Sequence, residues 1–296
     1  MERPESCSVL SLAAGEPLAG TAPQARIWIA WEYAGPWGRR ALESQRLNPQ
    51  VRQGLVALSE VPGVSVLLVR RPPMVTGLAG PVVLLAHAAG TPPTAFVAPQ
   101  PEPAVIASWA DELGVGRLPE CVGRRAMAEP ALLVCGHSSR DACCAIEGRR
   151  LLSQLHARGV PAWESSHLGG HRFAPTALLL PDGLIVGRVS ADSARTLIAD
   201  GMVDLETWRG RSTSSPAGQV AELAVRREIN ERRLEMLDVD DEGNGSVRIT
   251  HRDGRQWLVH VESRRGPTAR PESCGGGSHL PAVVDCTSLA AVPDLR

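Results

Sequence analysis

A chain of 296 residues with 43% hydrophobic residues is long enough for two compact domains, and its net charge of -1 gives no overall attraction to nucleic acid or an anionic membrane. Nowhere do about 18 apolar residues follow one another, and the N-terminus lacks the apolar stretch of a signal peptide, so we expect a cytoplasmic protein without a membrane span. All 31 basic residues are Arg, which indicates a GC-rich, bacterial genome. Because thiols stay reduced in the cytosol, the seven cysteines favour metal binding or redox chemistry over a disulfide framework.

The first part of the chain alternates strand-like and helix-like stretches. Residues 1–20 are small and polar and are interpreted as an extended arm. β-Branched and aromatic runs predict strands, and apolar residues at helical spacing predict helices. The expected order is strand 24–33, helix 40–58, strands 64–69, 82–88 and 94–98, and helix 103–113.

The same order then appears a second time. Strand 131–135, helix 143–157, strands 160–164, 176–180 and 184–189, and helix 191–199 are expected. The order β-α-β-β-β-α is that of a thioredoxin-like fold, so the sequence predicts an α/β protein with two such modules in tandem. The first would span residues 1–118 with its arm, and the second residues 119–203. We expect the first to be a structural partner of the second.

Residues 204–296 follow a different pattern and form a predicted C-terminal extension. A helix is expected at 217–230, and strands at 247–250 and 257–262 form a hairpin around Asp253-Gly254, a strong turn signal. The Gly- and Pro-rich tail from Arg264 is expected to wrap over the surface.

The chemistry is concentrated between Cys135 and His171. Cys135 ends a predicted strand, and Cys144 falls in the first turn of the next helix, where free N–H groups and the helix dipole favour a thiolate. His167 and His171 flank a glycine pair that permits a tight loop. Adjacent side chains on a helix diverge by about 100°, so Cys143 and Cys144 are not expected to serve the same centre.

Three interpretations compete for these residues. Structural zinc suits the ligand types, but zinc sites usually take cysteines two to four residues apart. A thiol-dependent redox enzyme could use Cys135 with Cys143 or Cys144, although a Cys-x-x-Cys motif is lacking. A 2Fe-2S cluster fits best, because it needs two ligands on each of two irons.

Two long segments resemble the sucrase/ferredoxin-like family: GHSSRDACCAIEGRRL and WESSHLGGHRFAPTALLLPDGLIVGRV. A third, GTAPQARIWIAWEYAGPWGRRAL, is similar to the family near the N-terminus. The resemblance implies a thioredoxin-like ferredoxin whose 2Fe-2S cluster is bound, through iron, by Cys135, Cys144, His167 and His171. Relatives often carry Arg where this chain has Cys143, so the resemblance selects Cys144 as the ligand.

The predicted function is therefore one-electron transfer, with an unidentified redox protein as donor or acceptor and neither nucleic acid nor membrane as partner. Histidine ligands raise the reduction potential and can couple it to proton uptake, as in Rieske centres. We expect a carrier rather than a catalyst. Sugar hydrolysis needs two positioned carboxylates, and the spacing of the acids near the site implies no such pair.

The remaining residues near the site receive local explanations. Asp141 is expected to cap the helix that begins near Ala142. The charged or ionisable residues beside the ligands, His137, Arg140 and Arg172, are interpreted as solvated loop residues. Cys121, Cys274 and Cys286 have no partner by spacing and are interpreted as buried or incidental thiols.

Overall fold

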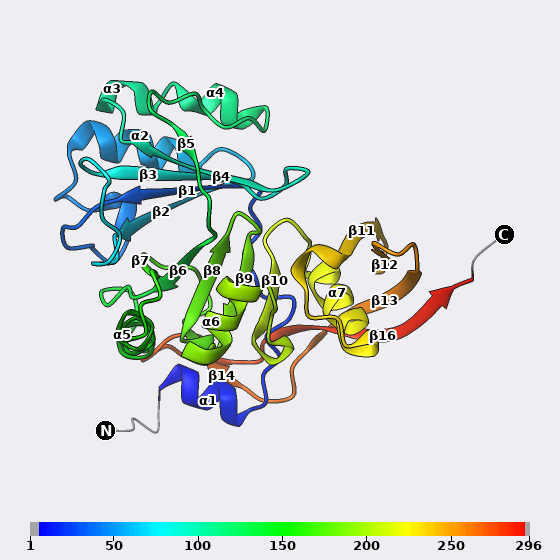
Figure 1. Cartoon of the computed structure of the whole chain (residues 1–296). Helices are drawn as coiled ribbons and strands as arrows, with labels where there is room; N and C mark the ends of the chain where they lie inside the picture. Colours follow the sequence, from blue (N-terminus) through cyan, green and yellow to red (C-terminus); the bar gives the residue numbers. More distant parts are fainter. Residues whose placement is uncertain (1–5, 294–296) are drawn as a thin grey trace.

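A sheet of ten strands organises the computed structural model, which describes residues 6–293 (Figure 1). The expectation of an α/β protein is confirmed. In spatial order the sheet is β10-β9-β8-β6-β7-β2-β1-β3-β4-β5. The strands are β1 (Ile27–Glu32), β2 (Val64–Arg70), β3 (Val82–His87), β4 (Thr94–Pro99), β5 (Arg125–Ala126), β6 (Ala131–Cys135), β7 (Trp163–Ser165), β8 (Thr176–Leu180), β9 (Leu184–Gly187) and β10 (Trp208–Arg211).

The same pairing pattern occurs on both sides of the junction between β2 and β7. β1 runs parallel to β2 and antiparallel to β3, and β6 runs parallel to β7 and antiparallel to β8. The two halves join where β2 pairs with β7, with Val69 opposite Ser165. Strand β6 therefore lies inside a continuous sheet, and its residues are all buried.

Two expected helices of the first half are shorter or broken. The helix expected over 40–58 becomes a 3-10 turn, η1 (Ala41–Glu43), followed by α2 (Pro49–Ser59). Pro49 disfavours helical backbone at Asn48, whose side chain instead accepts hydrogen bonds from the first free N–H groups of α2. The helix expected over 103–113 is divided at Ala107 into α3 (Pro103–Ile106) and α4 (Trp109–Gly114).

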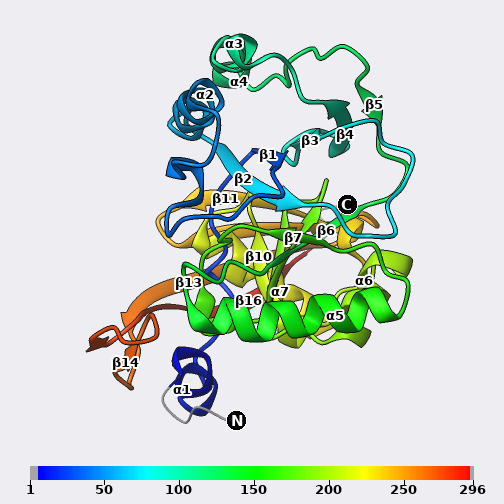
Figure 2. The same ribbon diagram turned by 90° about the vertical axis from the view of Figure 1, so that its left-hand side faces the viewer.

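In the second half, α5 (Arg149–Ala157) lies across one face of the sheet and contacts β6 and β7 (Figure 2). Its buried Leu151 and Leu155 pack against Leu132 and Val134 of β6. The helix expected to run without interruption from Cys143 contains a π-helical turn, η2 (Cys144–Gly148), before α5 begins. Helix α6 (Ala191–Asp200) lies close to its expected position.

The C-terminal extension is more regular than expected. A four-stranded sheet, β11 (Leu237–Gly243), β12 (Ser246–His251), β13 (Gln256–Arg265) and β16 (Ala282–Val292), packs on α7 (Pro216–Ile229). The predicted hairpin is confirmed as β12 and β13. The tail interpreted as a surface wrap instead supplies β16, which pairs along β13, while the short strands β14 (Arg270–Pro271) and β15 (Ser278–His279) pair with each other.

The extended arm expected for residues 1–20 is wrong for part of its length, and residues 1–5 lie outside the described residues. Helix α1 (Cys7–Ala13) begins after Ser6, whose hydroxyl accepts a hydrogen bond from the Val9 N–H. A Ser N-cap is a helix-start signal, and here the helix is further held by packing on distant segments. Both views place α1 beside β14, so the beginning of the chain packs against the segment that precedes β16 (Figures 1 and 2).

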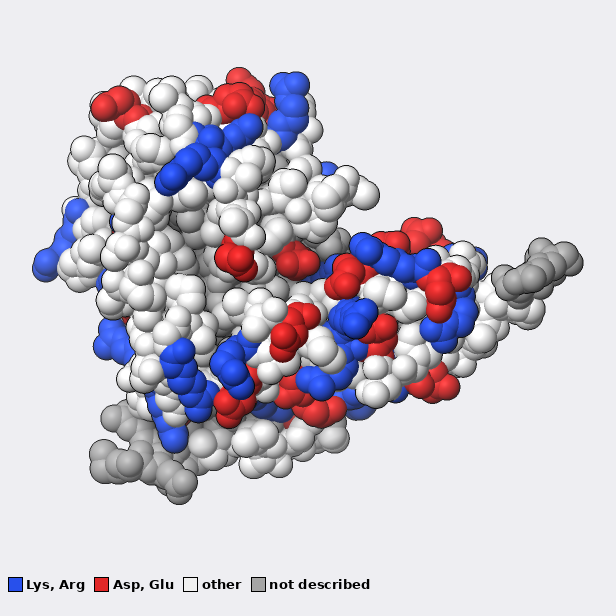
Figure 3. Space-filling view, viewed as in Figure 1, with Lys and Arg blue, Asp and Glu red and all other residues white. Residues whose placement is uncertain are grey.

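The molecule carries acidic and basic side chains side by side on the face of α7 and the C-terminal sheet (Figure 3). Within residues 6–293, every helix is too short or too polar to cross a bilayer.

Candidate metal centre

Three of the four predicted ligands meet at the end of β6. The Cys135 sulfur lies 3.9 Å from Nδ1 of His167, and the Cys144 sulfur lies 3.8 Å from the same nitrogen. The donor atoms of all three residues lie within 4.8 Å of one another. Both cysteines are at most 1% exposed, so the thiols are shielded from water, whereas His167 is half-buried.

The π-helical turn brings Cys144 next to Cys135. At Gly148, where this turn ends, a Cβ atom would lie 1.9 Å from the carbonyl oxygen of Cys135. Only glycine allows the helix to lie this close to the strand end. The wide turn and the close approach together fix the separation of the two thiols, and π-turns are frequent at functional sites.

Arg209 supports the loop between His167 and His171. Gly169 and Gly170 both have positive φ, +76° and +66°, which glycine adopts without strain. The Arg209 guanidinium, 1% exposed, donates a 3.1 Å hydrogen bond to the Gly169 carbonyl and also contacts Thr21. A side chain at Gly170 would meet this guanidinium at 2.6 Å. The glycine pair therefore lets the loop settle on a buried cation from β10.

His171 lies directly behind His167 rather than inside the three-donor group. Its Nδ1 is 3.4 Å from Nε2 of His167, and the two rings lie face to face with a tilt of 31°. Its Nε2 is buried and has no hydrogen-bond partner among the described residues, and Asp141 lies 3.8 Å away. The structure therefore brings three of the four predicted ligands together and leaves His171 one ring further out, between His167 and Asp141.

The two thiols are electrically unequal. The hydrogen bond from Cys144 lowers the pKa of Cys135 well below its usual value and outweighs the effect of burial, while the same contact and burial raise the pKa of Cys144. Burial lowers the pKa of Arg209 to about 9, and attraction to Cys135 and Cys144 acts in the opposite direction. Cys135 is thus the first thiolate of the site, with a guanidinium nearby. Two thiols and two imidazoles form a donor set suited to zinc or to a Rieske-like iron–sulfur cluster.

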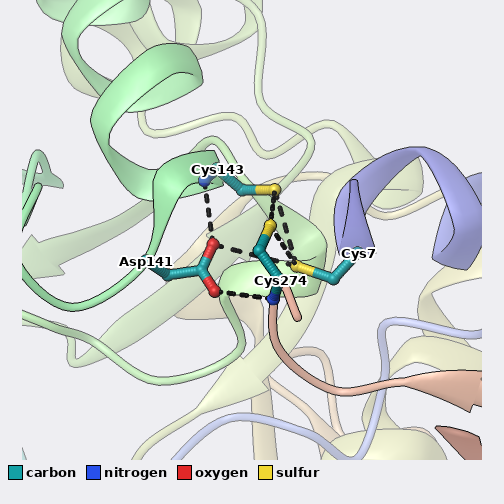
Figure 4. A group of neighbouring side chains, drawn as sticks. All are labelled: Cys7, Asp141, Cys143 and Cys274. Carbon is teal, nitrogen blue, oxygen red and sulfur yellow. Dashed lines mark hydrogen bonds between the residues drawn. The ribbon is translucent and has the colours of Figure 1, made fainter. Parts of the chain in front are cut away.

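Cys143 points away from this site, as expected for a residue adjacent to Cys144. It meets two cysteines from the ends of the chain, and we call Cys7, Cys143 and Cys274 the three-cysteine group (Figure 4). Cys274, interpreted from the sequence as a buried or incidental thiol, thus has neighbouring thiols that spacing along the chain does not show. One sequence signal did exist: the pentapeptide RPESC occurs twice, ending at Cys7 and at Cys274.

The residues beside the ligands are less solvated than expected. His137 is 2% exposed, its Nε2 lies 2.8 Å from the Gly38 carbonyl, and burial lowers its pKa. Arg172 forms an ion pair with Glu16 at 2.8 Å. The helix-capping role of Asp141 is confirmed, since its carboxylate accepts a 2.8 Å hydrogen bond from the Cys143 N–H.

A family model described as Sucrase/ferredoxin-like matches residues 18–210, more than half of the chain. The matched span includes Cys135, Cys144, His167 and His171. Cys7 and Cys274 lie outside it. No curated protein and no solved structure matches the chain.

Proposed function

Because the chain belongs to the sucrase/ferredoxin-like family, we propose that Cys135, Cys144, His167 and His171 bind a 2Fe-2S cluster and that the protein transfers single electrons. The observation that carries this proposal is the convergence of two buried thiols and one imidazole, with the His171 ring packed against the far side of the His167 ring. When bound, such a cluster accepts and releases one electron at a potential set by its ligands and surroundings.

The protein's own residues prepare both sides of this centre. The cysteine side is closed to solvent, which keeps thiolates from oxidation and exchange. The histidine side is more open, since the His171 side chain is 12% exposed. We therefore place the docking of a redox partner protein at the His167–His171 loop, where the path from the ligands to the surface is shortest.

Two features tune the potential in the same direction. Neutral imidazoles replace two thiolates, and the Arg209 guanidinium lies under the loop. Both reduce the negative charge at the centre, so they favour the reduced state. A ligand imidazole that gains a proton on reduction would make the transfer proton-coupled, and the midpoint potential would then fall as the pH rises.

The repeated strand order supports a tandem thioredoxin-like architecture, with residues 1–118 and 119–203 as the modules and 204–296 as an extension. In this arrangement the first module extends the sheet of the second through the β2–β7 pairing. All four proposed ligands of the cluster lie in the second module.

The proposal is tested by analysing anaerobically purified full-length protein for iron, sulfide and visible absorption. We expect about two irons and two sulfides per chain. Single Ser substitutions of Cys135 or Cys144, and Ala substitutions of His167 or His171, should remove or alter the cluster, whereas Cys121→Ser should not. A His171→Cys variant that keeps the cluster should have a lower midpoint potential, because it adds a negative ligand.

Other results would favour other functions. A colourless protein with one zinc lost in Cys135→Ser would support a zinc-stabilised binding module, and a metal-free protein that turns over disulfides would support a thiol-dependent redox enzyme. A midpoint potential that stays flat between about pH 6 and 9 would reject the proton-coupled version alone.

A further inference from the structure

The three-cysteine group has the dimensions of a site for one metal ion. The sulfur atoms are 3.5 Å apart for Cys7 and Cys143, 3.4 Å for Cys143 and Cys274, and 3.7 Å for Cys274 and Cys7. Thiolates bound to tetrahedral zinc at about 2.3 Å lie roughly 3.8 Å from one another, so the observed triangle is within about 0.4 Å of that spacing.

Asp141 stands at the fourth corner. Its carboxylate and the three sulfur atoms lie within 4.8 Å of one another, and Oδ1 is 3.9 Å from the Cys7 sulfur. The same carboxylate accepts hydrogen bonds from the N–H groups of Cys143, at 2.8 Å, and Cys274, at 3.0 Å (Figure 4). Asp141 thus fixes the backbone of two of the cysteines and still has lone pairs free for a cation.

We propose that Cys7, Cys143, Cys274 and Asp141 form a second, structural site for a single thiophilic divalent cation of the zinc type. Three of the four donors are buried, since Cys7, Cys143 and Asp141 are 0%, 3% and 6% exposed, and Cys274 is half-buried. Four protein donors and little access for water are the marks of a structural rather than a catalytic zinc site. Binding converts the thiols to thiolates, and their protons leave to solvent as the metal enters.

The duplicated pentapeptide supports the proposal independently of the distances. Cys7 and Cys274 each stand at the last position of an RPESC pentapeptide, and both contact Cys143. A disulfide joins only two thiols and would leave the third without a role, whereas here three thiols lie within contact distance of one another. A metal ion satisfies all three together.

Positive charge is available to balance the ligands. Arg172 and Arg270 both contact Glu16, and Arg270 is 2% exposed with Nε and Nη1 unpartnered among the described residues. Burial lowers the pKa of both guanidinium groups, and interaction with Cys7 acts in the opposite direction. One buried and one half-buried cation beside a ligand set with excess negative charge reduce the cost of holding that charge.

The consequence is structural support for the candidate metal centre. Cys143 precedes Cys144, and Asp141 lies 3.8 Å from Nε2 of His171. A cation at the second site would fasten α1 and the 270–274 segment to the helix turn that carries Cys144. The candidate metal centre and the second site have no donor residue in common, so their metals can be counted separately.

The test measures zinc and iron in the same full-length samples by elemental analysis after growth with added zinc sulfate. We expect one zinc per chain in the unmodified protein, lost in Cys7→Ser and Cys274→Ser and kept in the matched controls Cys286→Ser and Cys121→Ser. Because the zinc count does not depend on iron, a failure of the cluster proposal leaves this result readable. Zinc lost in Cys135→Ser instead would assign the metal to the first site.

A second measurement covers variants that fail to fold. In the unmodified protein, added Zn²⁺ should slow alkylation of Cys7, Cys143 and Cys274, read by peptide mass spectrometry, and leave the exposed Cys286 unchanged. The proposal is overturned if the unmodified protein takes up no zinc beyond the first site, if both Ser variants keep it, or if two of the three thiols are joined in a disulfide.

Discussion

The approach of Gly148 to Cys135 makes a quantitative prediction for Gly148→Ala. The new Cβ would lie 1.9 Å from the Cys135 carbonyl oxygen, whereas real Cβ contacts essentially never fall below 3.0 Å, so the helix turn or the strand end must move by at least about 1.1 Å. Overpacking of this kind costs about 1–3 kcal/mol, and the better helix propensity of Ala returns up to about 1 kcal/mol. With the full gain in helix propensity, we expect a net destabilisation of up to about 2 kcal/mol.

The effect on metal binding should be larger than the effect on stability. Metal–ligand distances are tolerated within about 0.2 Å, and the required shift is roughly five times that and acts directly on the Cys135–Cys144 separation. Gly148→Ala should therefore lose most of its bound iron while remaining folded by circular dichroism. The control is Gly114→Ala at the end of α4, where an added Cβ has nothing within 4 Å.

Iron content and the urea unfolding midpoint are the two readouts. If Gly148→Ala keeps the iron content and the midpoint of the unmodified protein, the helix does not set the thiol separation, and our account of the π-turn is refuted.

Two further predictions concern stability. Glu222 accepts hydrogen bonds from the guanidinium groups of Arg226, at 2.8 Å, and Arg211, at 3.0 Å, and Glu222 and Arg226 are fully buried. Glu222→Gln leaves a buried cation unpaired, so it should lower the free energy of unfolding, measured with urea, by about 3–5 kcal/mol. The double variant Glu222→Met/Arg226→Met should lose less, and equal losses would contradict the ion pair as the cause. Burial raises the pKa of Asp182 above its unfolded value of about 3.8, so the stability contributed by this carboxyl group is fully present below the unfolded pKa and is lost as the pH rises through the folded pKa. Asp182→Asn should therefore raise the urea midpoint at pH 7 and leave it unchanged near pH 3.5. An effect of equal size at both pH values would show that burial of the charge is not the cause.

Local patterns in the sequence were enough to place many of the elements. Strands 131–135 and 176–180 have the expected bounds, because short apolar runs between turn residues fit a buried strand better than a helix. The Asp141 cap was also readable, since it depends on residues within one turn. The separation of Cys143 from Cys144 followed from helix geometry alone.

Other features required the folded chain. The break before Pro49 had a local signal, but the helix α1 depends on packing against segments far along the sequence. Strand β16 exists because β13 offers it an edge, and a strand in a Gly- and Pro-rich tail has too weak a pattern to be found without that partner.

The sequence by itself determined the ligand types, their spacing along the chain and the glycine pair between His167 and His171, because these are properties of neighbouring residues. Only the tertiary structure decided that Arg209 supports that loop and that Cys7 and Cys274 meet Cys143. The contacts of Cys143 with Cys7 and with Cys274 join residues 136 and 131 positions apart, and no periodicity or capping rule acts over such a distance. Packing of α1 against the segment that carries Cys274, rather than any local preference, creates the three-cysteine group.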